Sequence, residues 1–209
     1  MVRTKKAYLL MVSVVMIFIV YVLYHNFVQD PQAAEFLHLK TDLKRTLHVD
    51  AWLTVMRIHV VFACLSMVAG AANFSAWIRM KYPKLHRMIG YLYLMCVLIV
   101  VVTSGYMAPY ATGGKASSMA FNLLNIIWAA FTIVAIVKIK KKQVLSHRKW
   151  MTRSYAFVFT NLAIHLLTSL FHGGFGLAYT DSYKIAVYGS IVLLIFLAEL
   201  VIRIVYKKA

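Results

Sequence analysis

Six long apolar stretches dominate the chain, and each is nearly free of charged side chains. They cover residues 7–27, 58–78, 88–107, 118–137, 154–171 and 185–206. Each is close to the ~20 residues that an α-helix needs to cross a hydrocarbon layer of ~30 Å. The alternating pattern of a β-barrel is absent, and open strands would leave backbone polar groups unpaired in lipid. The pattern therefore predicts an all-α, integral membrane six-helix bundle.

Composition supports this class. Of the 209 residues, 62% are hydrophobic and 14% are charged, whereas a soluble domain carries about 25% charged residues. The first apolar stretch is longer than the core of a secretion signal and is expected to be a retained anchor. Cys64 and Cys96 both lie inside apolar stretches, which excludes a disulfide framework or a CxxC site.

The basic residues predict the orientation. The segments 3–6, 79–87, 138–153 and 203–208 hold 17 of the 23 Lys and Arg side chains. The other six are Lys40, Lys44, Arg45, Arg57, Lys115 and Lys184, near acids that include Asp42. By the positive-inside rule, both termini are cytoplasmic. The net charge of +17 lies in short loops, where it contacts membrane lipids, so we expect no nucleic-acid partner.

The expected organisation has three parts. Residues 1–51 form an anchor helix and an extracytoplasmic loop, residues 52–175 form a four-helix core, and residues 176–209 form the sixth span. The loop 28–52 is expected to hold a short surface helix. Glu199 and Arg203, four residues apart, are expected to pair with each other.

Polar residues recur at helical intervals inside four of the spans. Each set falls on one helix face and should point toward other helices instead of lipid. The sets are His59, Ser66, Gly70, Asn73 and Trp77; His86, Gly90, Tyr93 and Ser104; Asn122, Asn125 and Ala129; and Ser154, Asn161, His165, Ser169 and His172.

Two of these histidines are expected at the same depth in the membrane. Counted from the span ends, His59 and His165 share one level, and facing imidazoles are the axial ligands of a b-type haem. The predicted cofactor site comprises His59, His165, Asn73, Tyr93 and Asn161, with haem iron as its metal. The alternative is that these histidines only donate hydrogen bonds between helices.

A second group lies at the cytoplasmic edge. His86 and Arg87 open the third span, and His147, Arg148 and Arg153 precede or begin the fifth. Cations at helix N-termini favour an anion: a phosphate, a lipid head group or the polar end of a quinone. The alternative is interfacial anchoring by Arg and Trp.

No nucleophilic triad, phosphate-cradling glycine loop or paired carboxylate is visible, so we assign no catalytic residue. Because the spans lack acids in their core, we expect neither a carboxylate proton relay nor a divalent-cation site. Whether the chain is an enzyme stays open.

Two motifs resemble a known family. The segments 57–93, with Pro83-Lys84-Leu85-His86-Arg87-Met88-Ile89-Gly90-Tyr91-Leu92-Tyr93, and 147–155, with His147-Arg148-Lys149-Trp150-Met151-Thr152-Arg153, resemble the bacterial membrane proteins grouped as domain of unknown function 2306. The resemblance covers residues 52–170. It implies a multi-pass inner-membrane protein and carries over His59, His86, Arg87, Gly90, Tyr93, His147, Arg148, Trp150 and Arg153. Family members often have Arg at the position of His165, so ligation by His165 would be particular to this chain. The layout also resembles six-helix two-haem cytochromes b, although their ligands include the fourth helix.

The sequence thus supports three hypotheses. The first is a redox-associated protein of the inner (plasma) membrane that binds haem or quinone between spans two, three and five. The second is a non-enzymatic binding or transport module for a small anionic or lipid-like molecule. The third is a structural subunit that associates with another membrane protein.

Overall fold

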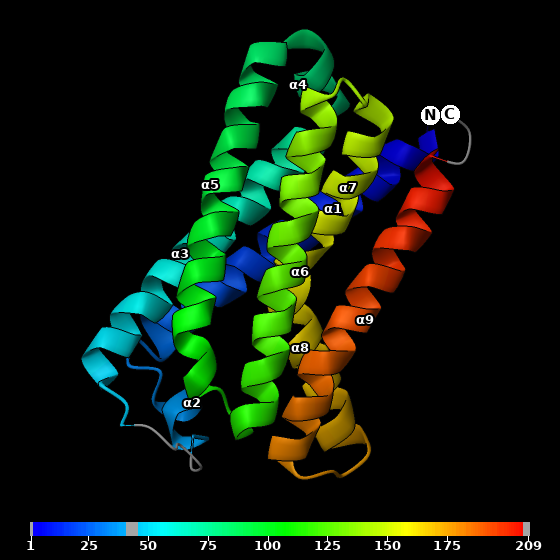
Figure 1. Ribbon diagram of the computed structural model, residues 1–209. Coiled ribbons are helices and arrows are strands. Elements are labelled where there is room, and N and C mark those ends of the chain that lie inside the picture. The colour runs from blue at the N-terminus through cyan, green and yellow to red at the C-terminus, as the bar shows by residue number, and fades with distance from the viewer. Residues whose placement is uncertain (1, 41–45, 207–209) are drawn as a thin grey trace. The chain divides into compact units, whose positions relative to one another are not determined.

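The computed structural model describes residues 2–40 and 46–206 (Figure 1). Every regular element in these two segments is helical. Six helical stretches are long and apolar enough to cross a membrane: Lys5–Gln29, Val49–Phe74, Pro83–Tyr110, Gly114–Lys140, Val144–Gly174 and Tyr179–Tyr206. The predicted class, all-α with six spans, is confirmed. Asp42, Lys44, Arg45, Lys207 and Lys208 lie outside the described residues.

The chain divides into two compact units, and each is described by itself. The first combines Met1–Leu37 with Asp50–Thr103, and the second combines His38–Val49 with Ser104–Ala209. Each unit groups the residues that pack most closely with one another. The expected grouping of residues 52–175 as a functional core stays a prediction.

The first unit contains three of the spans. Its elements are α1 (Val2–Tyr24), which continues as the π-helical turn η1 (His25–Gln29), α2 (Ala34–His38), α3 (Val49–Phe74), α4 (Ala76–Lys81) and α5 (Pro83–Met107), whose last turn belongs to the second unit. The expected short helix in the loop is α2. Both carboxylate oxygens of Asp30 accept hydrogen bonds from its first N–H groups, those of Ala34 at 2.8 Å and Glu35 at 3.0 Å.

The second span ends earlier than residue 78. Ser75 adopts an extended conformation and accepts a hydrogen bond from the Ile78 N–H at 3.4 Å, so it ends α3 and caps α4. The expected face from His59 to Asn73 therefore lies within α3, whereas Trp77 lies in α4 and is 58% exposed. The assignment of Trp77 to that face was wrong because the chain changes direction at Ser75.

The second unit contains the other three spans. Its elements are the 3₁₀ turn η2 (Ala108–Tyr110), α6 (Gly114–Lys140), α7 (Val144–Ala156), the 3₁₀ turn η3 (Phe157–Phe159), α8 (Thr160–Ser169), the π-helical turn η4 (Leu170–Gly174) and α9 (Tyr179–Tyr206). Figure 1 shows α6 and α7 side by side as an antiparallel hairpin, with α8 beside α9.

A pair of buried hydroxyls joins the two helices of this hairpin. Thr132 Oγ1 lies 2.7 Å from Ser154 Oγ and donates to the carbonyl oxygen of Trp128 at 2.8 Å. A hydroxyl carries one proton, so Ser154 is the donor between the two side chains. Thr132 is 1% exposed and Ser154 is fully buried. Polar side chains at this level of the hairpin therefore face a neighbouring helix, as expected inside a membrane.

The fifth span is not one regular helix. Between α7 and α8 the backbone tightens into the 3₁₀ turn η3, where the Thr160 hydroxyl donates to the Phe157 carbonyl oxygen at 2.7 Å. A 3₁₀ residue advances about 120° instead of 100°, so three of them rotate the following helix by about 60° relative to a regular count.

This turn divides the polar face expected along the fifth span. Ser154, before the turn, is fully buried, whereas the members after it, Asn161, His165, Ser169 and His172, are exposed. The prediction that all five share one buried face was wrong, because it assumed an uninterrupted α-helix.

Candidate functional site

The His59 side chain is held against α5 within the first unit. Its Nδ1 lies 2.9 Å from Oγ1 of Thr103 in α5. The Thr103 hydroxyl donates its single proton to backbone carbonyls of its own helix, those of Ile99 at 2.7 Å and Val100 at 3.0 Å. Thr103 therefore accepts from the imidazole, and the neutral ring of His59 carries its proton on Nδ1. Its Nε2 is left with a lone pair.

This arrangement is typical of a metal-ligating histidine. In metal sites, the nitrogen that does not bind the metal donates to a neighbouring oxygen, which fixes the tautomer and the ring orientation. His59 is half-buried within α3, inside a candidate span. The side chain is thus oriented, and its free ring position is suited to a ligand that accepts an electron pair.

Asn73 lies at the other end of α3 and contacts the start of α5. With the amide oriented so that both ends are satisfied, its nitrogen donates to the His86 carbonyl oxygen at 3.0 Å and to His86 Nδ1 at 3.1 Å. Its oxygen accepts from the Gly90 N–H at 2.9 Å. Asn73, a predicted cofactor residue, and His86, a predicted anion residue, therefore belong to one network that joins two spans.

The remaining predicted cofactor residues have different surroundings. Tyr93 is 1% exposed in the interior of α5. Asn161 and His165 are exposed on α8. His59 belongs to the first unit and His165 to the second, so their pairing across a haem stays a prediction.

Three of the predicted anion residues lie at the α6–α7 end of the second unit. His147 Nδ1 lies 2.8 Å from the Ala135 carbonyl oxygen, and the Arg148 guanidinium lies 4.9 Å from the centre of the Tyr206 ring. Arg153 lies over Trp150 at 4.4 Å. The aromatic rings hold both guanidinium groups in place. Arg87, in the first unit, is exposed.

The partner of Glu199 differs from the expected one. Its Oε1 lies 2.6 Å from Nε of Arg153 in α7. No ion pair between Glu199 and Arg203 is found in the described part of the chain, so that prediction was wrong. Arg203 is exposed on α9, while Arg153 comes from a helix 46 residues earlier, and no local spacing indicates such a contact.

This ion pair leads to a stability prediction. Glu199→Gln should lower the melting temperature in detergent by about 2–4 °C, the effect of about 1 kcal/mol on a chain of this size. Arg203→Gln is the matched control and should change the melting temperature by much less. An equal decrease for both variants would contradict the assignment of Arg153 as the partner.

Sequence reasoning also missed groups at the opposite end of the second unit. Lys40 donates to the Tyr110 carbonyl oxygen, and burial lowers the pKa of its ammonium group to about 8. Thr112 and Ser117 are almost fully buried next to this contact in sequence. Within the two described segments, no three His, Cys, Asp or Glu side chains gather as a metal site would require.

The comparisons with known proteins address the family. The comparison with curated proteins found no match, and neither did the comparison with solved structures. The family model described as "Predicted membrane protein (DUF2306)" matches residues 56–202. This match extends beyond the expected end at residue 170 and includes most of α9. The chain therefore belongs to the membrane-protein family of domain of unknown function 2306.

Proposed function

We propose that this membrane protein binds a b-type haem and takes part in electron transfer, and that His59 is a residue that would hold the iron. The observation that supports the proposal is the hydrogen bond from His59 Nδ1 to Thr103, which leaves Nε2 with a lone pair. An intramembrane histidine is a functional candidate in its own right, because polar groups are costly there.

The tautomer of His59 with its proton on Nδ1 favours haem over an oxidised quinone as the ligand. A quinone carbonyl oxygen accepts hydrogen bonds, and Nε2 without a proton has nothing to donate. Iron takes an electron pair from the same nitrogen. Asn161 and Ser169 are exposed polar side chains of α8, and polar side chains inside a membrane favour contact with a polar partner.

The first experiment is an absorption spectrum of the full chain, expressed with added haem precursor and purified in detergent. We expect a Soret band, a reduced-minus-oxidised difference spectrum typical of b-type haem, and about one haem per chain by the pyridine haemochrome assay. A monodisperse protein without a Soret band would reject the haem proposal. Extraction of the same sample with organic solvent tests for a bound quinone.

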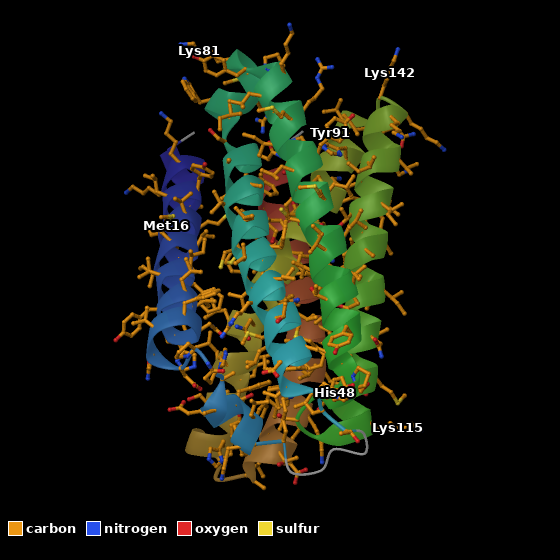
Figure 2. All side chains as sticks on the ribbon, turned by 90° about the vertical axis from the view of Figure 1, so that its left-hand side faces the viewer. Met16, His48, Lys81, Tyr91, Lys115 and Lys142 are labelled. Carbon is orange, nitrogen blue, oxygen red and sulfur yellow. The ribbon has the colours of Figure 1, made fainter. Side chains whose placement is uncertain are left out.

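The anion-binding hypothesis is the second candidate, and the placement of Arg148 favours it. Its guanidinium is oriented by Tyr206, while Arg153 nearby is neutralised by Glu199. Lys138, Lys140, Lys141 and Lys142 lie at the same end of the α6–α7 hairpin, and Figure 2 shows Lys142 at this end. These cations suit the phosphate of an anionic lipid.

Arg148→Ala should reduce the amount of phosphatidylglycerol that copurifies with the protein by about fivefold, because one cation near a lipid surface contributes about 1 kcal/mol. Thin-layer or mass-spectrometric analysis of extracted lipid measures this. Lys115→Ala, which removes an exposed cation at the other end of α6, is the control. Unchanged lipid in Arg148→Ala would reject a specific role for this side chain.

The proposal also includes a location. The resemblance to the family favours the inner (plasma) membrane, and the distribution of basic residues favours an orientation with both chain ends in the cytoplasm. The third hypothesis, a structural subunit that associates with another membrane protein, stays a prediction.

A further inference from the structure

Two series of polar side chains in the second unit have the same spacing of seven residues. They comprise Ser118, Asn125 and Thr132 on α6, and Ser154, Asn161 and Thr168 on the fifth span. Seven residues are almost two turns, so each series lies along one face of a regular α-helix. Because α6 and α7 are antiparallel, equal steps from the Thr132–Ser154 bridge reach Asn125 with Asn161, and then Ser118 with Thr168. Two uninterrupted helices would therefore bring three polar pairs together.

The hydroxyl bridge is formed in the structure, but the other two pairs are not. Asn125 is 5% exposed, and neither its amide nitrogen nor its amide oxygen has a hydrogen-bond partner among the residues that the structure describes. Thr168 is 7% exposed, and its hydroxyl is also without a partner there. Asn161, by contrast, is exposed. Burying unpaired polar groups is unfavourable, above all where no water can replace the missing partner.

The height of α8 along α6 is the one that these pairs require. Ile164 of α8 lies in one buried cluster with Ala120 of α6. The ring centre of Phe157 lies 6.5 Å from that of Trp128. Both placements keep the register of the hydroxyl bridge to within two residues. The mismatch is therefore a rotation of α8 about its axis, by the angle of about 60° that the three 3₁₀ residues of η3 introduce.

Irregular turns bound α8 at both ends, and they deviate from an α-helix in opposite senses. The 3₁₀ turn η3 is wound more tightly than an α-helix, whereas the π-helical turn η4 is wound more loosely. Converting both turns to α-helix would rotate α8, while the two changes largely cancel beyond it, so α7 and α9 keep their orientations. No proline lies between Phe157 and Gly174, so every residue of this stretch can become α-helical.

We propose that α8 switches between two rotational states. The first, described above, is held by apolar packing of Ile164 against α9 and of Phe157 against α6. In the second, η3 is α-helical and both unformed polar pairs close. Asn125 and Asn161 then satisfy each other, because every amide side chain has a donor and an acceptor. The switch does not involve the contact of His59, so it is independent of the proposed haem.

Disulfide trapping in the full chain would detect the second state. Asn125→Cys is combined with Asn161→Cys, and oxidation of the monodisperse protein is followed by mass spectrometry of the digested monomer, which identifies this disulfide. Thr132→Cys with Ser154→Cys is the positive control, because the two side-chain oxygens that it replaces lie 2.7 Å apart. Ile126→Cys with Asn161→Cys is the negative control, since Ile126 is 67% exposed and points about 100° away from Asn125 around α6.

The pair at the two asparagine positions should oxidise about 10- to 100-fold more slowly than the positive control, the rate of a state that is populated at about 1–10%. It should still oxidise much faster than the negative control. A rate as low as that of the negative control would overturn the proposal, because the two positions would never meet. A rate as high as that of the positive control would also overturn it, because the two positions would then be adjacent in a single state.

A further pair tests whether the asparagines stabilise the second state. Ser118→Cys with Thr168→Cys leaves Asn125 and Asn161 in place, and it does not require the first double variant to fold. In this background Asn125→Leu should slow oxidation about fivefold, because the second state loses a hydrogen-bonded pair. Asn122→Leu, which removes an exposed amide of the same helix, is the matched control and should leave the rate unchanged. An unchanged rate in Asn125→Leu, or equal slowing by Asn122→Leu, would overturn the proposal.

Discussion

Replacing His59 by alanine should abolish the Soret band of the purified protein, while the chain remains folded and monodisperse. The reason is that His59 Nε2 carries the lone pair that would coordinate iron. His172→Ala is a matched control, because this imidazole is exposed and its Nδ1 is hydrogen-bonded to the Leu177 carbonyl oxygen at 2.8 Å. Full haem content in His59→Ala would show that His59 is not a ligand.

Thr103 provides a more specific test of the same site. Thr103→Val keeps the side-chain shape but removes the acceptor for His59 Nδ1–H, so haem affinity should fall by about 10- to 100-fold. Thr103→Ser keeps the oxygen and should retain most of the haem. A purely structural hydrogen bond would instead lower thermal stability without changing the absorption spectrum. His165→Ala, measured alongside, tests whether His165 is the second ligand.

Replacing Phe157 by alanine should cause the largest loss of stability among core substitutions in the second unit. The Phe157 side chain is 1% exposed, with its ring centre 5.7 Å from that of Phe131 and 6.5 Å from that of Trp128. Truncation leaves a cavity beside the 3₁₀ turn. In a membrane the transfer from water contributes little, so we expect about 3 kcal/mol, the low end for this substitution.

This loss corresponds to a decrease of about 6–12 °C in the melting temperature. Thermal unfolding in detergent, followed by tryptophan fluorescence or loss of monodispersity, measures it. Phe175→Ala provides the comparison, because Phe175 is 68% exposed and should leave the melting temperature nearly unchanged. Equal stabilities for the two variants would show that the turn is not held by ring packing.

The six spans could be predicted from the sequence because about 20 consecutive apolar residues identify a span without any knowledge of its contacts. The interruptions within the spans could not be predicted in this way. Ser75 ends α3 through an ordinary serine cap inside an apolar region, and η3 forms without a proline or glycine in Phe157–Phe159. The Phe157 ring in this turn packs against Trp128 and Phe131 of α6, and a count along one helix does not include such contacts.

The candidate functional site could be predicted only in part, because its contacts join different helices. Helical spacing identified His59 and Asn73 as polar members of one helix, but their partners, Thr103 and His86, lie on another. Local spacing suggested the wrong partner for Glu199. Arg203 is four residues away on α9, but α7 packs beside α9 and its Arg153 lies within contact distance of the carboxylate. The hydroxyl groups of Thr112 and Ser117 near the start of α6 could be identified only from their burial in the structure, because isolated Ser and Thr residues carry no sequence signal.

The hydroxyl bridge between Thr132 and Ser154 limits how the second unit can move. Sliding α7 past α6 by a single residue would break the bridge in surroundings without water to replace it. The two helices should therefore travel together as a rigid body. Any rearrangement of the second unit is then expected where the backbone is already irregular, at Phe157–Phe159 or Leu170–Gly174.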